Sequence, residues 1–96
     1  MVRSLPKDVT GQVITRQLSR CGTSIGANIE EAQGAQSRAE FARRMNIALS
    51  EARETSYWLR LMRESGIARA NRLENIIQES EELISILKKT RQTKVK

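Results

Sequence analysis

One helical segment governs the fold, and it reads Arg20-Cys21-Gly22-Thr23-Ser24-Ile25-Gly26-Ala27-Asn28-Ile29-Glu30-Glu31-Ala32. In and just before it, apolar and small residues recur at spacings of three and four, which is one face of an α-helix. These are Ile14, Leu18, Cys21, Ile25, Asn28, Ile29 and Ala32. Gly22 and Gly26 each cost about 1 kcal/mol relative to alanine inside a helix, and close approach of a neighbouring helix is the usual compensation. We therefore expect the central helix of a bundle, packed at short range on at least one side.

The composition predicts a single all-α domain over residues 1–96. Only Phe41, Tyr57 and Trp58 are aromatic, and no segment shows the alternating pattern of a half-buried strand. No apolar run approaches the roughly 18 residues that suggest a membrane span, and residues 1–6 lack the apolar core of a signal peptide. We therefore expect a cytoplasmic protein without a membrane segment.

Capping signals divide the chain into three helices that form an antiparallel bundle. Asp8 is a candidate N-cap, Gly34 a candidate left-handed residue after the first helix, and Gly66 the stop of the second. Ser37 and Glu40 form a capping box at the start of the second helix. The expected helices are about 9–33, 37–65 and 69–90, with a basic C-terminal tail at 88–96.

The second and third helices each carry an apolar stripe. In the second it comprises Phe41, Met45, Ala48, Leu49, Ala52, Leu59 and Met62, at heptad-like spacing. In the third it comprises Leu73, Ile76, Ile77, Leu83, Ile84 and Leu87. Trp58 and Leu61 lie off the stripe of the second helix and form a second apolar flank. Two flanks predict contacts with more than one neighbour.

The sequence argues against an enzyme. It has no histidine, the commonest general base and transition-metal ligand, and no phosphate-binding loop of the GxxxxGK[ST] form. Cys21 is the only cysteine and lies on the apolar face, as expected for a buried thiol that acts as a small hydrophobe. We therefore predict no catalytic residues, no cofactor and no metal site.

The net charge of +6 is concentrated at the C-terminus. Five basic residues without an acid supply most of it, namely Lys88, Lys89, Arg91, Lys94 and Lys96. The rest of the chain carries twelve basic and eleven acidic residues, a net charge of +1. This distribution is only weak evidence for nucleic-acid affinity.

A polar stripe on the second helix is the main candidate for nucleic-acid binding. It comprises Arg43, Asn46, Ser50, Arg53, Tyr57 and Arg60, and Arg63 lies beside its end. Guanidinium groups along a helix suit a phosphate backbone, and Tyr57 suits base stacking. The alternative, favoured by the near-neutral body, is a solvated stripe partly neutralised by Glu40, Glu54 and Glu64. Arg16, Arg20, Lys88, Lys89 and Arg91 are further candidates for the same surface.

Several polar residues have expected structural roles. Arg16 and Arg20 are one turn apart, and pairing with glutamates of the second helix is the alternative to nucleic-acid binding. Asn28, on the apolar face, is expected to fix the register of the helices or to cap a neighbouring backbone. Glu30 and Glu31 are unfavourably placed near a helix C-terminus, so we expect arginine partners from the next helix, such as Arg38.

In the order and spacing of many residues, the chain resembles a bacterial four-helix-bundle family. The founding members of that family are encoded in intervening sequences of 23S rRNA genes and were formerly called S23 ribosomal proteins. The matching residues are Gln17-Leu18, Arg20, Ser24-Ile25, Asn28-Ile29, Glu31, Ser37, Glu40-Phe41, Asn46-Ile47-Ala48, Glu51-Ala52, Glu54 and Tyr57-Trp58-Leu59. The resemblance covers roughly residues 6–87 and implies elongated antiparallel bundles that assemble into toroidal homopentamers. A distant branch serves diversity-generating retroelements as an accessory protein that binds reverse transcriptase and RNA.

The chain departs from the family pattern at two places. Gly26 stands where the family often has proline, so a kink there either persists or relaxes. The family's first helix would precede Pro6, so we expect a three-helix version or a chain whose start lies further upstream. In the three-helix version the small residues of the first helix lack a partner, and we expect another subunit to cover them.

The sequence thus predicts a non-enzymatic, self-assembling helical-bundle scaffold that associates with RNA or another nucleic acid. The alternative is a protein-protein interaction module or accessory subunit without direct nucleic-acid binding. We expect a homo-oligomer, a pentamer by resemblance. The candidate interface residues are Cys21, Gly22, Ile25, Gly26, Ile29, Trp58 and Leu61.

Overall fold

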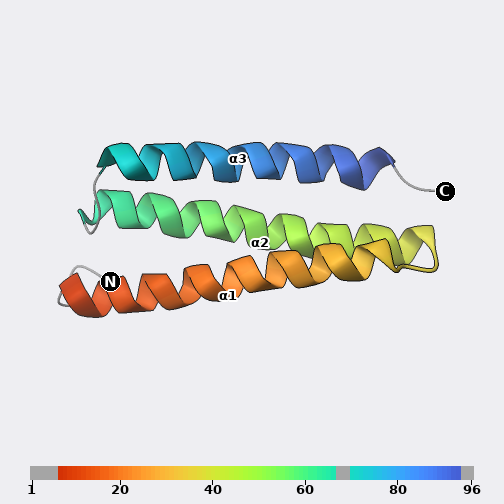
Figure 1. Cartoon of the computed structure of the whole chain (residues 1–96), viewed down its shortest axis with the longest axis horizontal. Coiled ribbons are helices and arrows are strands. Elements are labelled where there is room, and N and C mark those ends of the chain that lie inside the picture. The colour runs from red at the N-terminus through yellow and green to blue at the C-terminus, as the bar shows by residue number, and fades with distance from the viewer. Residues whose placement is uncertain (1–6, 67–69, 94–96) are drawn as a thin grey trace.

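A computed structural model of the chain describes residues 7–66 and 70–93, with side chains described for residues 9–66 and 73–91. It contains three helices, α1 (Lys7–Gln33), α2 (Arg38–Glu64) and α3 (Ala70–Thr93), and no strand in the described ranges. The helices run antiparallel to their neighbours and give an elongated molecule of 49 × 21 × 18 Å (Figure 1). The predicted all-α antiparallel bundle is confirmed. None of the described helices is long and apolar enough to cross a membrane.

The helix at the centre of the fold is α2. It packs along its length against α1 on one side and α3 on the other, whereas the described backbones of α1 and α3 come close to each other at hardly any position (Figure 1). The expectation that the first helix is central is therefore wrong. The physical reason is the pattern of side chains: α2 carries an unbroken row of apolar and small residues wide enough for two neighbours.

The core lies over this row and contains side chains from all three helices. The buried residues of α2 are Met45, Ala48, Leu49, Ala52, Ser56 and Leu59, which confirms most of the predicted stripe. One cluster joins the first four of them to Ile25 and Ala32 of α1 and Leu87 of α3. A second joins Leu59 to Leu73 and Ile77 of α3. Ile76, expected in the stripe of α3, is 42% exposed.

The helix ends agree with the predicted capping signals only in part. Ser37 caps α2, and its Oγ accepts a hydrogen bond from the Glu40 N–H at 3.0 Å. The Glu40 carboxylate accepts from the backbone N–H of Gln36 at 3.3 Å, so the capping box closes one residue further out than expected. Gly66 ends α2 with a left-handed φ of 71°.

Two other expected caps are wrong. Gly34 does not adopt a left-handed conformation, because its N–H reaches the Glu31 carbonyl at 3.2 Å and the Ala35 N–H reaches Ala32 at 3.1 Å. These bonds satisfy the last carbonyls of α1 without a positive φ. Asp8 is not an N-cap, because α1 begins at Lys7.

The basic C-terminus is largely helical rather than a tail. Because α3 continues to Thr93, the residues Lys88, Lys89 and Arg91 belong to its last turns, where cations suit the helix dipole. Lys94 and Lys96 lie outside the described residues, as do Pro6 and the lead-in before it.

One edge of α1 consists of small residues, and we call Gly11, Thr15, Ser19, Gly22 and Gly26 the small-residue edge. A Cβ atom added at Gly22 or Gly26 would meet nothing within 4 Å. Short-range packing of these glycines within the chain is therefore ruled out for the described residues. The helix is continuous through Gly26, so α1 has no break at the position where the sequence left a kink open.

The small-residue edge lies on a flank of α1, outside the row of buried side chains. Helical spacing places Gly22 on the same flank as Leu18 and Ile29, at intervals of four and seven residues. Leu18 packs against the cluster that contains Leu73 and Ile77 of α3, and Ile29 against the cluster that contains Leu87. The small residues therefore lie beside side chains through which α1 joins both core clusters.

Candidate functional site

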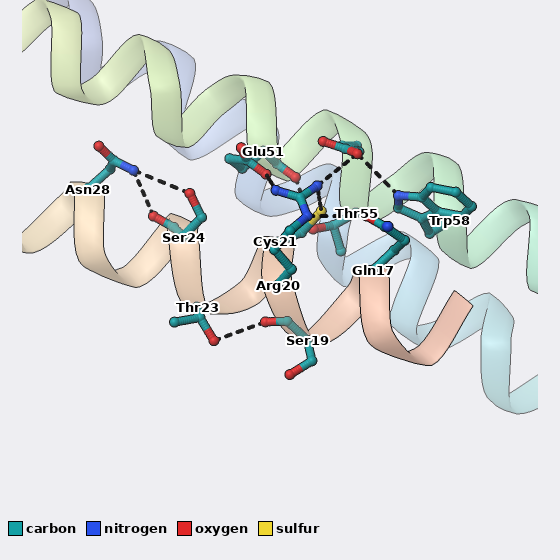
Figure 2. Close-up of polar contacts among 11 residues, drawn as sticks. Gln17, Ser19, Arg20, Cys21, Thr23, Ser24, Asn28, Glu51, Thr55 and Trp58 are labelled. Carbon is teal, nitrogen blue, oxygen red and sulfur yellow. Dashed lines mark hydrogen bonds and ion pairs between the residues drawn. The ribbon is translucent and has the colours of Figure 1, made fainter. Parts of the chain in front are cut away.

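Arg20 of α1 organises a polar cluster against α2, which we call the Arg20 cluster (Arg20, Cys21, Glu51, Glu54). One terminal nitrogen of its guanidinium lies 2.9 Å from Glu54 Oε2, and the other lies 3.4 Å from Glu51 Oε1. The first nitrogen also donates to Cys21 Sγ at 3.3 Å. Figure 2 shows the Arg20 side chain reaching across from α1 toward Glu51 on α2. Of the two roles considered for Arg20, pairing with glutamates of the second helix is the one observed.

Three groups of this cluster have metal-ligating atoms, because Cys21 Sγ and one oxygen each of Glu51 and Glu54 lie within 4.8 Å of one another. The Arg20 guanidinium already contacts all three. Its single positive charge is shared by the two carboxylates. The arrangement therefore acts as an ion-pair network that joins α1 to α2.

The environment of Cys21 suppresses its nucleophilicity. The residue is 0% exposed, and burial raises the pKa of its thiol, with the Glu54 carboxylate acting in the same direction. The guanidinium of Arg20 opposes the shift but does not outweigh it. The thiol therefore stays protonated at neutral pH, which confirms the expectation of a buried structural cysteine.

Glu54 connects the Arg20 cluster to the aromatic residues of α2. Hydrogen bonds from Arg20 and from Trp58 hold the pKa of the Glu54 carboxyl below its ordinary value. The Trp58 Nε1–H donates to Glu54 Oε2 at 3.3 Å. The rings of Trp58 and Tyr57 form a T-shaped pair, with centroids 5.1 Å apart and an interplanar angle of 71°.

A second polar bridge joins α1 to α2 near their connected ends. Asn28 is buried, its Nδ2 donates to the Ser24 carbonyl at 2.9 Å, and its Oδ1 accepts from Arg44 at 3.1 Å. The expected register-fixing role of Asn28 fits this position between the helices. Arg44 also lies 3.9 Å from Glu31, so Arg44, rather than the suggested Arg38, is the partner of that acid.

Polar side-chain contacts also join α2 to α3. The terminal nitrogen of Arg63 lies 2.7 Å from Glu74 Oε2, and Arg91 donates to Asn46 Oδ1 at 2.8 Å. Arg63 also lies 3.6 Å from Glu64. Arg63, a nucleic-acid candidate from its position in the sequence, is therefore engaged in structural pairing.

The polar stripe of α2 is exposed along its length, and we call its members the outer stripe: Arg43, Asn46, Ser50, Arg53, Tyr57 and Arg60. A shallow depression surrounds its Arg43, Asn46 and Ser50. Arg16, Lys88 and Lys89 are exposed as well but belong to other helices. Among the residues with described side chains, no carboxylate lies within ion-pair distance of Arg43, Arg53 or Arg60.

The acids expected to neutralise the outer stripe have other partners. Glu40 accepts from the Gln36 N–H, Glu54 pairs with Arg20, and Glu64 pairs with Arg63. Sequence reasoning missed this distribution, because it depends on which residues α1 brings to the flank of α2. None of these three glutamates forms an ion pair with an arginine of the outer stripe, so the expected neutralisation by direct pairing is not observed.

The candidate interface residues divide into two groups. Cys21 and Ile25 are buried by the chain itself, so they pack within the protomer, and their role at an interface stays a prediction. Gly22 and Gly26 are exposed, and Ile29, Trp58 and Leu61 are half-buried. Among the candidate interface residues of α1, the two glycines are the positions at which the described chain leaves space unfilled.

These observations define a class, an elongated antiparallel helical bundle in which polar clusters tie neighbouring helices together. The sequence profile of the 23S rRNA-intervening sequence protein family matches residues 1–89, and the chain belongs to this family. The resemblance seen in the sequence is confirmed.

A solved structure supports the same assignment. It is the crystal structure of a protein of unknown function from the S23 ribosomal protein family of Bacteroides thetaiotaomicron, 46% identical to this chain. The match has a TM-score of 0.80 and covers 84% of this chain and 72% of that protein. A comparison with curated protein sequences finds no match.

Proposed function

We propose that this protein is a non-enzymatic scaffold that assembles from several copies of itself and associates with RNA. The observation that carries the proposal is the exposed small-residue edge of α1, beside half-buried Leu18 and Ile29. The two glycines cost helix stability of about 1 kcal/mol each, and no contact within the described chain offsets that cost. A helix of another copy that approaches closely there would offset it.

Further apolar side chains support assembly. Val9, Val13, Ile76 and Ile86 are exposed by 37–58% on the two outer helices. Other copies packed against these helices would bury such surface. The family resemblance implies a pentamer, and the proposal adopts that number.

The exposed arginines of the outer stripe support RNA association, since basic residues free of acidic partners are what a phosphate backbone requires. Support for a non-enzymatic role comes from the absence of histidine in the sequence and from the buried, protonated thiol of Cys21. Arg20, which could have activated a nucleophile, is held by two carboxylates.

Light scattering and filter binding test the two parts of this proposal separately. At micromolar concentration we expect the mass of a multi-subunit assembly, and a melting temperature that rises with protein concentration. A monomer with a cooperative melt would contradict assembly. For RNA, we expect binding that weakens steeply with salt. No binding to structured RNA at low salt would favour the alternative, an accessory subunit that binds protein through the flank of Trp58 and Leu61.

A further inference from the structure

We propose that the outer stripe of α2 binds single-stranded RNA, with guanidinium groups on backbone phosphates and the ring of Tyr57 stacked on a base. This inference deepens the proposed RNA association and rests on it. It assigns the contact to one helix face and to an unpaired strand.

The glutamates near the outer stripe make their contacts elsewhere. Glu51 and Glu54 share the Arg20 guanidinium at 3.4 and 2.9 Å, and Glu64 lies 3.6 Å from the Arg63 guanidinium. Glu40 accepts from the Gln36 N–H, which satisfies its carboxylate without cancelling its charge. The arginines of the stripe have no carboxylate partner among the described side chains. Their positive charge is therefore available to an external polyanion.

The spacing of the stripe arginines suits an extended strand. Arg43, Arg53 and Arg60 lie on one face of an unbroken helix. At 1.5 Å per residue, about 15 Å separates the first two along the axis and about 10 Å the last two. An extended strand that follows the helix axis can place phosphates beside all three. Arg91 of α3, hydrogen-bonded to Asn46 at 2.8 Å, adds positive charge beside the same stripe.

Tyr57 lies between Arg53 and Arg60 of the outer stripe. The residue is 50% exposed, and its contact with Trp58, at a centroid distance of 5.1 Å, restrains the ring. Trp58 is itself anchored by its hydrogen bond to Glu54. A restrained, accessible aromatic ring among basic residues is the arrangement on which unpaired bases stack.

Stacking selects a single strand over a duplex. In an RNA duplex the bases are stacked on each other, and the deep, narrow major groove does not admit the side chains of a helix. Three arginines give only a modest electrostatic attraction, so the base contact supplies a substantial part of the affinity. An acidic protein segment would pair with the arginines but would gain little from Tyr57.

The test is fluorescence anisotropy of the full chain with a labelled oligoadenylate of about 20 nucleotides, between about 50 and 200 mM KCl. The stripe variant replaces Arg43, Arg53 and Arg60 by alanine. The matched control replaces Arg16, Arg38 and Lys89 by alanine, which removes the same charge from exposed residues off the stripe. We expect the stripe variant to bind at least about tenfold more weakly and its salt slope to fall by about 2. The control should lose less than about threefold.

Tyr57 provides a second, independent readout. Tyr57→Ala should weaken binding about tenfold, whereas Tyr57→Phe should keep it, because phenylalanine retains the stacking face. As controls, circular dichroism checks that each variant keeps its helices, and native mass spectrometry checks that it keeps its subunit number.

Four outcomes overturn the inference. If the wild type binds no RNA at low salt, RNA association and the inference both fail. If RNA binds but the two triple variants lose equal affinity, RNA association stands and the outer stripe is wrong. A labelled duplex that binds as tightly as the single strand contradicts the strand assignment. Polyglutamate that competes as well as RNA, with no effect of Tyr57→Ala, points to an acidic protein instead.

Discussion

Arg20 determines how charge is distributed over the surface beyond its own contacts. It holds Glu51 and Glu54 on the flank of α2 that faces α1, so neither forms an ion pair with an arginine of the outer stripe. It also lies on Cys21, so the thiol is buried beneath an ion pair. Exposed pairs of this kind contribute modestly to stability.

The pairing of Glu54 predicts a pH dependence of stability. Its pKa is lowered in the folded state, so the unfolded chain takes up the proton at higher pH. The stabilisation is therefore complete above the ordinary carboxyl pKa of 4.5 and is lost as pH falls through the lower folded value. We expect Glu54→Gln to reduce the fall in melting temperature below that pH. The control is Glu81→Gln, at an exposed acid of α3. Identical pH profiles for wild type and Glu54→Gln would contradict the pairing.

Burial of Cys21 predicts slow alkylation. Because the thiol is 0% exposed and its pKa is raised, we expect native protein to react with a thiol reagent at least about a hundredfold more slowly than protein unfolded in guanidinium. The chain has a single cysteine, so the reaction reports this site alone. Rapid, stoichiometric labelling of the native protein would show that α1 does not pack on α2 as described.

At the scale of the elements, local chemistry controls the helix ends. Ser37 caps α2 through a hydrogen bond of 3.0 Å, and it stands at the turn that reverses the chain between α1 and α2. This turn sets the antiparallel pairing on which the Arg20 cluster depends.

We expect Ser37→Ala to lower the free energy of unfolding by about 1 kcal/mol, because one N–H of the first turn loses its acceptor. Urea denaturation at fixed protein concentration measures it. Ser37→Asp should retain most of the stability, and Ser85→Ala, at an exposed serine of α3, should change it by less than about 0.5 kcal/mol. Equal losses from Ser37→Ala and Ser85→Ala would mean that the cap contributes nothing.

Features that depend on neighbouring residues were predictable from the sequence. The capping box at Ser37 and the buried row of α2 follow from spacing alone. The way in which α1 ends was not predictable from the sequence. Hydrogen bonds from residue i+3 to residue i satisfy the last carbonyls of α1, which a left-handed Gly34 would also have done. The pairs Arg20–Glu54 and Arg44–Glu31 join different helices, so their choice of partner depends on the register of packing, which spacing within a helix does not contain.

At the scale of the whole molecule, α2 supports one helix on each side and leaves α1 and α3 largely uncovered toward each other. The sequence predicted the class of fold and the family, since both follow from periodicity and motif order. It misplaced the central helix, because the small residues of α1 were interpreted as a sign of burial. Gly22 and Gly26 instead form an exposed edge, and the proposal of assembly depends on what covers it.

Native mass spectrometry of the wild type and of the double variant Gly22→Ala, Gly26→Ala tests this claim most directly. The added methyl groups meet nothing within 4 Å in the single chain, so the protomer accepts them. If another copy packs closely on the small-residue edge, the wild type is a multi-subunit assembly. The double variant then assembles more weakly and is dissociated at protein concentrations at which the wild type is still assembled. A monomeric wild type, with a double variant that is only more stable by about 1–2 kcal/mol from helix propensity, would contradict the account.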